Sequence, residues 1–285
     1  MKILVTGANG QLGSELKKIS KQYEYNWKFT SKIEFDFLNT ESISIVLDNI
    51  KPNFIINCAA YTLVDQAEIH KKKANTINHL ALELISKWCH ENYCKLIHIS
   101  SDFVYDGSSS IPIKENQKEI PINNYGKTKL KGEIACLSNC PDSIIIRTSW
   151  LYSSFGNNFV KKIINLSKRN SKINVVKDQI GSPTYAGDLA EVIMKIIINK
   201  HWVSGVFNFS NDGAISRYDF ANDIKMIYSF SNHINPLANG EYFEKIKRPK
   251  YTVLDNTKIK NTYNISLVPY LESLKKCIKI IKNAK

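Results

Sequence analysis

The chain has 285 residues, 43% of them hydrophobic, which is enough to bury the core of one large domain or of two unequal ones. Its formal net charge is +13, but only four of the 39 basic residues are arginine and the lysines are spread along the whole chain, so we expect a solvated cationic surface and no nucleic-acid partner. The sequence has no run of 18 apolar residues, no signal-peptide pattern and no C-x-x-C pair among its six cysteines, so it predicts a cytoplasmic protein with reduced thiols, no membrane segment and no zinc site.

Strands and helices alternate through the first half of the chain. Apolar runs predict strands at 2–6, 26–31, 54–58, 95–100 and 143–147, and amphipathic runs predict helices at 11–21, 40–49, 74–92 and 125–137. Strands that are separated by helices form parallel βαβ units, so the predicted fold class is α/β with a doubly wound parallel sheet, the Rossmann fold. We assign residues 1–150 to this dinucleotide-binding domain.

The predicted helix at 74–92 has a regular apolar face. Its members are spaced one, three or four residues apart: Ile77, Leu80, Ala81, Leu84, Ile85 and Trp88. Side chains with this spacing share one side of a helix, so we expect all six to face the core.

The pattern becomes less regular after Trp150. Helices are predicted at 157–168, 186–199 and 269–283, and the stretch 224–249 is rich in loops. We assign residues 151–285 mostly to a smaller substrate-binding lobe, with parts of about 180–215 returning to the sheet. Ligands of such sheets bind beyond the carboxyl ends of the strands, where this lobe can cover them.

The first predicted strand runs directly into a glycine-rich stretch, Thr6-Gly7-Ala8-Asn9-Gly10-Gln11-Leu12-Gly13. Its three glycines permit a tight turn, a close approach of the backbone to a pyrophosphate, and close packing of the next helix. The free N–H groups and the dipole at the start of that helix then favour an anion. Its place between a strand and a helix predicts a phosphate-binding loop for a dinucleotide, rather than an ordinary turn.

The second strand ends in Phe29-Thr30-Ser31-Lys32, without a carboxylate. Folds that prefer NAD place an Asp or Glu here, on the ribose 2′-hydroxyl. Lys32 could pair with a 2′-phosphate, or it could be one more solvated lysine. We therefore expect NADPH or NADH as the cofactor, with NADPH at least as good. A strong preference for NADH would indicate an acidic partner from elsewhere, such as Glu34.

Tyr125 and Lys129 stand four residues apart, which puts them on one face of a helix. Reduction of a ketone needs hydride on carbon and a proton on oxygen, and a phenol can supply the proton. A nearby ammonium favours the phenolate and is expected to lower the pKa of Tyr125. The pair therefore predicts a general acid-base unit, although the spacing alone is common.

Polar residues follow the predicted strand at 95–100. Ser101 can donate a hydrogen bond to a carbonyl oxygen and hold the charge that develops there, and Asp102 can accept from sugar hydroxyls. An ordinary turn at a strand end could also contain such residues. The glycine-rich loop, Ser101, Tyr125 and Lys129 in this order and spacing favour a catalytic set.

These residues resemble the extended short-chain dehydrogenase/reductase family, and within it the branch of dTDP-4-dehydrorhamnose reductases. The resemblance covers nearly the whole chain. Beside the glycine-rich stretch it rests on Asn57-Cys58-Ala59-Ala60-Tyr61-Thr62-Leu63-Val64-Asp65, Ile99-Ser100-Ser101-Asp102-Phe103-Val104-Tyr105-Asp106-Gly107, Tyr125-Gly126-Lys127-Thr128-Lys129, Arg147-Thr148-Ser149-Trp150, Asn157-Asn158-Phe159 and Asp178-Gln179-Ile180-Gly181-Ser182-Pro183-Thr184. The last three stretches favour the rhamnose branch over other branches.

The resemblance implies roles for residues that the motifs alone do not assign. Cofactor contacts are implied for Gln11, Leu12, Asp36, Phe37, Ala59, Ala60 and Tyr61, in addition to the glycines, Lys32, Tyr125 and Lys129. Substrate contacts are implied for Asp102, Trp150 and Asn158, and Lys161 and Arg248 are candidates for the diphosphate of a nucleotide sugar. Ser101 takes the place of a threonine that is usual in the family, and Phe103 that of a tyrosine.

The resemblance also bears on a metal and on assembly. Some members bind magnesium through acidic residues at a dimer interface, and Glu15 matches one of those positions. Gly187 falls where a second carboxylate is expected, so we assign no metal ligand and leave magnesium and a homodimer as open alternatives.

Three functions remain open from the sequence. The first is reduction of dTDP-4-dehydro-L-rhamnose, and the second is reduction of another nucleotide 4-keto-6-deoxysugar. The third is a non-catalytic NAD(P)-binding protein, because a regulatory subunit of methionine adenosyltransferase shares the fold and similar motifs. The set of Ser101, Tyr125 and Lys129 argues against the third, and an assay of cofactor oxidation would separate it from the others.

Overall fold

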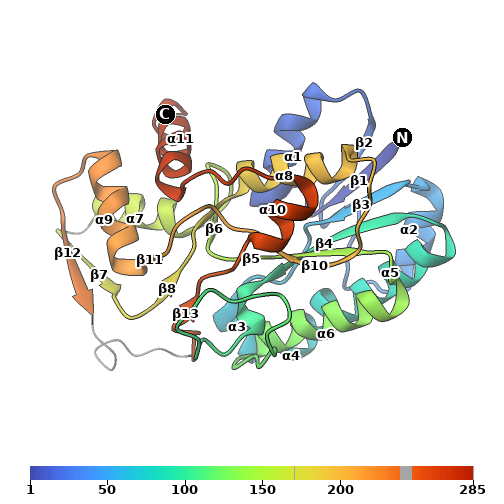
Figure 1. Cartoon of the computed structure of the whole chain (residues 1–285), viewed down its shortest axis with the longest axis horizontal. Coiled ribbons are helices and arrows are strands. Elements are labelled where there is room, and N and C mark those ends of the chain that lie inside the picture. Colours follow the sequence, from blue (N-terminus) through green and yellow to red (C-terminus); the bar gives the residue numbers. More distant parts are fainter. Residues whose placement is uncertain (170, 238–245, 285) are drawn as a thin grey trace.

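The computed structural model describes residues 1–169, 171–237 and 246–284, and a parallel sheet lies at its centre (Figure 1). In sheet order its six strands are β10 (Gly205–Asn208), β5 (Ile144–Thr148), β4 (Lys95–Ser101), β3 (Phe54–Asn57), β1 (Lys2–Thr6) and β2 (Asn26–Thr30). Each strand runs parallel to its neighbours. The five strands predicted in the first half are thus present, each within one residue of its expected bounds.

Helices cover both faces of the sheet, because side chains alternate between the faces along each strand. Ile3 and Val5 on β1 point to one set of helices and Leu4 to the other. The first set is α1 (Gln11–Ile19), α8 (Ala186–Ile198) and α10 (Thr257–Tyr263). The second set is α2 (Ser42–Ile50), α5 (Ala81–Glu91) and α6 (Asn124–Asn139). The predicted α/β fold with a doubly wound parallel sheet is confirmed.

The order of the strands reverses at β1. The chain goes from β1 to its neighbour β2 on one side, and later strands continue from β3 on the other side. The loops after β1 and β3 therefore diverge, and this divergence leaves a crevice at the carboxyl edge of the sheet. The glycine-rich stretch follows β1 directly, so it lies at this crevice.

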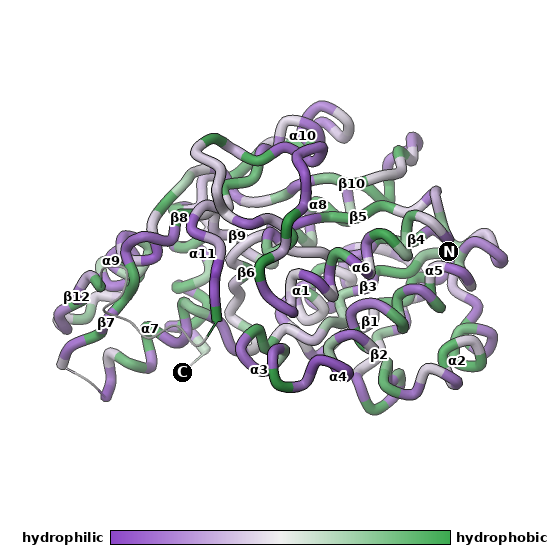
Figure 2. Tube along the Cα trace, turned by 90° about the horizontal axis from the view of Figure 1, so that it is seen from below, coloured by the Kyte–Doolittle hydropathy of each residue, from purple (hydrophilic) through white to green (hydrophobic). Residues whose placement is uncertain are grey.

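A smaller lobe stands beside the sheet, at the end of the molecule away from β2 and α2 in Figures 1 and 2. Its strands are β7 (Lys172–Val176) with β12 (His233–Leu237), and β8 (Ile180–Gly181) with β11 (Ile215–Ser216) and β13 (Tyr251–Thr252). Its helices are α7 (Phe159–Ser167), α9 (Arg217–Tyr228) and α11 (Tyr270–Asn283). They enclose a separate core around Ile164, Phe220 and Leu274. The short pair β6 (Leu151–Tyr152) and β9 (Thr184–Tyr185) follows β5 and precedes α8.

Parts of the second half of the chain belong to the sheet. Helix α8 packs on α1, β10 pairs with β5, and α10 contributes Ile259 and Tyr263 to the core of the sheet. The division of the chain near residue 150 stays a prediction. None of the helices in the described part of the chain is long and apolar enough to span a membrane.

The stretch 224–249, expected to be rich in loops, is partly regular. Helix α9 continues to Tyr228, and β12 follows at His233–Leu237, whereas residues 238–245 lie outside the described residues. The helix begins because the Ser216 hydroxyl accepts a hydrogen bond from the Asp219 N–H at 3.0 Å, an N-cap that the sequence analysis missed.

The expected face of helix 74–92 is partly wrong. The segment consists of α4 (Lys71–Asn75), a π-helical turn (Thr76–Leu80) and α5, and it follows the short helix α3 (Val64–Ile69). Leu80 and Leu84 are 38% and 39% exposed, while Leu82 and Cys89 are buried. Ala81, Ile85 and Trp88 are buried as expected, so the buried side of the helix includes part of the predicted face and extends to Leu82 and Cys89. Two 3-10 turns, Ser20–Gln22 and Asp102–Val104, complete the helical elements described.

Candidate active site

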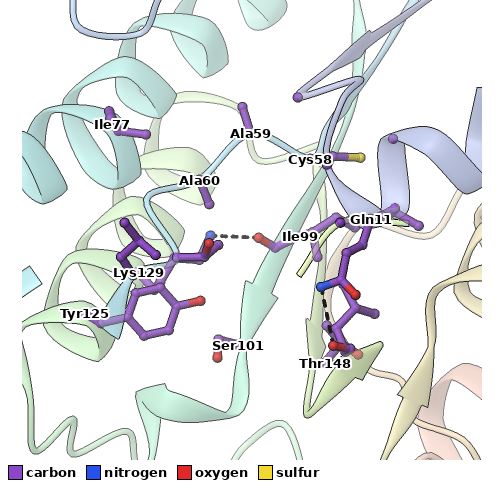
Figure 3. Close-up of a pocket in the computed structure, with 18 of the residues that line it drawn as sticks. Gln11, Cys58, Ala59, Ala60, Ile77, Ile99, Ser101, Tyr125, Lys129 and Thr148 are labelled. Carbon is purple, nitrogen blue, oxygen red and sulfur yellow. Dashed lines mark hydrogen bonds between the residues drawn. The ribbon is translucent and has the colours of Figure 1, made fainter. Parts of the chain in front are cut away.

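A cavity of about 810 Å³ opens at the carboxyl edge of the sheet, between the sheet and the smaller lobe. Its walls come from loops that follow β1, β2, β3, β4 and β5, and from the smaller lobe. The predicted residues that line it are Gly7, Gly10, Gln11, Leu12, Gly13, Lys32, Asp36, Phe37, Ala59, Ala60, Ser101, Asp102, Tyr125, Lys129, Trp150 and Arg248. The structure thus brings most of the predicted site into one cavity, part of which Figure 3 shows.

The glycine-rich loop forms one end of this cavity. Gly7 has a φ of +65°, and a Cβ there would lie 2.8 Å from the backbone nitrogen of Ala59. A Cβ on Gly13 would lie 2.4 Å from the carbonyl oxygen of Gly7. Larger residues would therefore push the loop away from both β3 and α1. The backbone presents a cradle without side chains, which fits the diphosphate of a dinucleotide at the start of a helix.

The wall after β2 carries charges of both signs. Lys32 lines the cavity with Ser31, and its pairing with a 2′-phosphate stays a prediction. The Glu34 carboxylate accepts a hydrogen bond from the Ser31 N–H at 2.8 Å, and this bond lowers the pKa of Glu34. Glu34, which the sequence analysis considered only for the case of an NADH preference, does not itself line the cavity.

Ser101 and Tyr125 face each other across the cavity (Figure 3). Tyr125 lies in the first turn of α6, which Asn123 caps by accepting from the Gly126 N–H at 2.9 Å. The ring of Phe103 meets the Tyr125 ring edge-on at 5.5 Å and fixes its orientation. A hydroxyl at position 101 and a phenol are thus held together where a carbonyl group could reach both.

Burial raises the pKa of Tyr125 to about 12, and the hydrogen bond with Ser101 offsets this only in part. The expected lowering of this pKa by Lys129 is therefore wrong for the protein alone. The Lys129 Nζ instead donates to the carbonyl oxygen of Ile99 at 2.7 Å and lies 3.0 Å from Nε2 of His98. Burial lowers the pKa of Lys129 to about 8.

The other end of the cavity holds Asp102, Trp150 and two arginines. The Asp102 side chain accepts from the Ser101 hydroxyl at 3.0 Å through Oδ1, while its buried Oδ2 has no hydrogen-bond partner within the described residues. Burial raises the pKa of Asp102 to about 6. Trp150 has a φ of +45°, an unfavourable conformation for a tryptophan that the lobe junction maintains.

Arg217 is the main lining residue that the sequence analysis missed. Its guanidinium stacks 3.6 Å over the Trp150 ring, and among the described residues no carboxylate forms an ion pair with it. Burial lowers its pKa to about 9, opposed by the charge of Asp102 and reinforced by that of Arg248. Arg248 also lines the cavity and bonds Asp65 at 2.6 Å. Two guanidinium groups thus face one space, which favours an anionic ligand.

Three predicted residues lie off the cavity wall. Tyr61 is buried and bonds Asn78 through its N–H at 2.8 Å. Asn158 caps α7 and donates to the Gln11 side chain at 3.0 Å, and the Lys161 ammonium donates to the Ser154 carbonyl at 3.2 Å. Asn158 therefore supports a cavity residue, Gln11, instead of lining the space itself. The ligand contacts implied for these three residues stay predictions.

Glu15 is buried beneath this region and accepts a hydrogen bond from the Ser153 hydroxyl at 2.6 Å. Asp188, next to Gly187, bonds Asn211 at 2.7 Å. In residues 1–169, 171–237 and 246–284, no three His, Cys, Asp or Glu side chains form a group that could hold a metal ion. Within the chain, the carboxylate of Glu15 is thus bonded to the hydroxyl of Ser153.

Comparison with known proteins finds relatives that span the whole chain. Residues 1–283 match the family model described as the RmlD substrate binding domain. The dTDP-4-dehydrorhamnose reductase of Aggregatibacter actinomycetemcomitans is 36% identical over 285 residues, which cover 96% of this chain and 97% of that protein. The dTDP-4-keto-6-deoxy-D-glucose reductase of Streptomyces niveus is 34% identical, covering 88% of this chain and 87% of that protein. A crystal structure of dTDP-4-dehydrorhamnose reductase from Bacillus anthracis, in complex with NADP, has a TM-score of 0.94 at 34% identity, covering 98% of this chain and 99% of that chain.

Proposed function

We propose that this chain, which belongs to the family of the RmlD substrate binding domain, reduces the C4 ketone of a nucleotide 4-keto-6-deoxysugar with NADPH or NADH. The substrate we propose first is dTDP-4-dehydro-L-rhamnose, and the product is dTDP-L-rhamnose, a precursor for cell-surface polysaccharide. The observation that carries the proposal is one cavity that joins a glycine-rich phosphate cradle to the pair of Ser101 and Tyr125.

The residues of this chain fit the two halves of a ketone reduction. A bound NADPH or NADH supplies the hydride. Tyr125 donates the proton to the carbonyl oxygen, and its raised pKa keeps it protonated until charge develops there. Ser101, whose hydroxyl donates to Asp102 Oδ1 in the structure, turns this proton to the same oxygen, and the ammonium of Lys129 contributes a positive charge.

The opposite end of the cavity suits a sugar diphosphate. The unpaired Oδ2 of Asp102 is an acceptor for a sugar hydroxyl, and Trp150 offers an apolar surface for a 6-deoxy methyl group. We assign the phosphates to Arg217 and Arg248, because an anion there would pair with the desolvated guanidinium of Arg217 and reduce its repulsion by the partly exposed Arg248. This assignment replaces Lys161 by Arg217 in the proposed diphosphate site.

The test is to incubate the purified protein with NADPH and a panel of nucleotide 4-keto-6-deoxysugars, and to identify the products by NMR. The panel includes dTDP-4-dehydro-L-rhamnose and dTDP-4-keto-6-deoxy-D-glucose, on which the Streptomyces niveus relative is named to act. We expect dTDP-L-rhamnose with the highest kcat/KM. Reduction of another member alone would move the assignment within the family. Failure to oxidise NADPH with any member would favour a non-catalytic binding protein.

A further inference from the structure

A polar row crosses the middle of the sheet beneath the catalytic helix. Thr6, Asn57 and His98 are neighbours in register on β1, β3 and β4, and each is only 1% exposed. Two residues earlier on the same strands, and hence on the same face, stand Leu4, Ile55 and Leu96, which pack into the apolar core. Buried polar groups in such a place are costly unless they bond one another, so this row requires an explanation.

The row ends at Lys129. The Thr6 hydroxyl and Asn57 Oδ1 are 2.6 Å apart, Asn57 Nδ2 and His98 Nδ1 are 3.0 Å apart, and His98 Nε2 and Lys129 Nζ are 3.0 Å apart. Lys129 is itself only 1% exposed. A continuous chain of hydrogen bonds therefore joins the residue before Gly7, at the base of the phosphate loop, to the proposed catalytic lysine.

The direction of these bonds depends on the charge of Lys129. An ammonium has donors only, so it can bond His98 only if Nε2 is the bare nitrogen and Nδ1 carries the proton. Nδ1–H then needs the oxygen of the Asn57 amide. In the arrangement of the structure Asn57 turns its NH₂ to Nδ1 instead, which puts the proton on Nε2 and requires a neutral amine at Lys129.

A half-turn of the Asn57 amide converts one arrangement into the other. The Thr6 hydroxyl can donate to the amide oxygen or accept from the amide nitrogen, so it accommodates both. When Lys129 loses one proton to solvent, its nitrogen gains a lone pair, and the single ring proton of His98 changes from Nδ1 to Nε2. His98 stays neutral in both states, in line with its burial, which holds its pKa well below the usual range.

We propose that His98 is a positioning residue that reverses its hydrogen bond with Lys129, so that this buried lysine is held in place both as an ammonium and as an amine. Its part in turnover rests on the proposed function, but the reversal itself needs no substrate. The ionisable groups that face Lys129 are Tyr125, Glu133 and Cys136 on its own helix and His98 on β4. Glu133 is held by Arg147 on β5 at 2.6 Å, which leaves His98 as the side chain that bonds Lys129 Nζ directly.

The first test follows the ring of His98 in the wild-type protein without substrate. Nitrogen-15 chemical shifts distinguish the two neutral tautomers of histidine, and a pH titration reports their exchange. We expect the Nδ1–H form at low pH and the Nε2–H form at high pH, with a midpoint near 8, the pKa to which burial lowers Lys129. One tautomer throughout the titration would overturn the proposal, whatever substrate the protein reduces.

The second test replaces His98 by two amide side chains of different length. In His98→Gln the amide takes the place of Nε2 and can bond Lys129 in either direction, whereas in His98→Asn it takes the place of Nδ1 and leaves Lys129 without this partner. We expect His98→Gln to keep the wild-type pH profile of kcat/KM. We expect the basic limb of His98→Asn to move about one to two units to lower pH, because the ammonium loses a charge-assisted bond. Identical profiles for the two variants would mean that His98 only fills space.

Discussion

The two halves of the cavity differ in the kind of residue that lines them. The half beneath the glycine-rich loop consists mostly of backbone and small residues such as Gly7 and Ala59, from loops that directly follow neighbouring strands. The other half brings together Asp102, Trp150 and Arg217, of which the first and the last are 115 residues apart in the sequence. The first half is nearly free of buried charge, whereas the second holds a carboxylate and a guanidinium whose pKa values burial has shifted. This contrast suggests that a cofactor common to many enzymes is bound by local chain geometry, and that the choice of substrate depends on long-range charge.

Tyr125 stands where the two halves meet, so its loss should have the largest effect. Tyr125→Phe removes the proton donor and keeps the ring against Phe103, so kcat should fall roughly 10²–10⁴-fold while NADPH binding is retained. Steady-state kinetics and a binding titration measure the two quantities. Tyr152→Phe is the matched control, because its buried hydroxyl has no hydrogen-bond partner in the described part of the chain and lies outside the cavity wall. Equal kcat for the two variants would remove Tyr125 from the chemistry.

Asp102 tests whether a buried charge in the substrate half of the cavity destabilises the folded protein. Its pKa is raised from 3.8 to about 6, so the folded protein binds the proton more tightly than the unfolded chain does. Stability is therefore lost as the pH rises from about 4 to about 6, by about 3 kcal/mol for two pKa units, and the loss stays constant above that. Asp102→Asn should recover much of this at pH 8 and nothing below pH 4, while kcat/KM falls.

Urea unfolding of wild type and Asp102→Asn at both pH values measures the difference. A control is Asp106→Asn, since Asp106 bonds the neighbouring Ser108 at 2.9 Å on the surface. Equal stability of Asp102→Asn and wild type at pH 8 would show that the carboxylate is solvated and that the charge costs nothing.

Arg217 tests the proposed diphosphate site. Arg217→Gln should raise KM for the nucleotide sugar by about 10- to 100-fold, the worth of a bond to a charged group, and leave KM for NADPH unchanged. The exposed Arg169 supplies the matched control, because Arg169→Gln changes net charge equally without touching the cavity. Equal effects on both KM values would indicate that Arg217 supports the lobe as a whole through its stacking on Trp150.

Arg217 also illustrates what the sequence reveals and what it hides. The strands along the chain, the glycine-rich turn after β1 and the meeting of Tyr125 and Ser101 at one sheet edge could be predicted, because each depends on residues close together in the chain or at successive strand ends. The position of Arg217 depends on the short strand β11 and helix α9, whose start at Ser216 was not recognised. One signal was present. In a chain that uses lysine almost everywhere, three of the four arginines form specific contacts: Arg147 with Glu133, Arg217 with Trp150 and Arg248 with Asp65.

Physical reasons also explain the errors. The helical segment at 74–92 buries a side that includes Leu82 and Cys89, so Leu80 and Leu84 lie at its exposed edge. The pKa of Tyr125 depends on burial, which outweighs the charge of a lysine that points to Ile99.

The smallest effect is expected at the cofactor half, where Lys32 and Glu34 carry opposite charges in the loop after β2, near the proposed position of a 2′-phosphate. Both side chains are exposed, so each charge should change the ratio of kcat/KM for NADPH and NADH only about two- to fivefold. Lys32→Gln should lower the ratio, because it removes the cation, and Glu34→Gln should raise it, because the anion that bonds Ser31 is lost. Glu24→Gln, an equally exposed change before β2, should leave the ratio unchanged. Because both charges are solvated, the effects of the two variants on the ratio should become smaller at high salt. A ratio that neither variant changes would mean that this loop binds the ribose through its backbone alone.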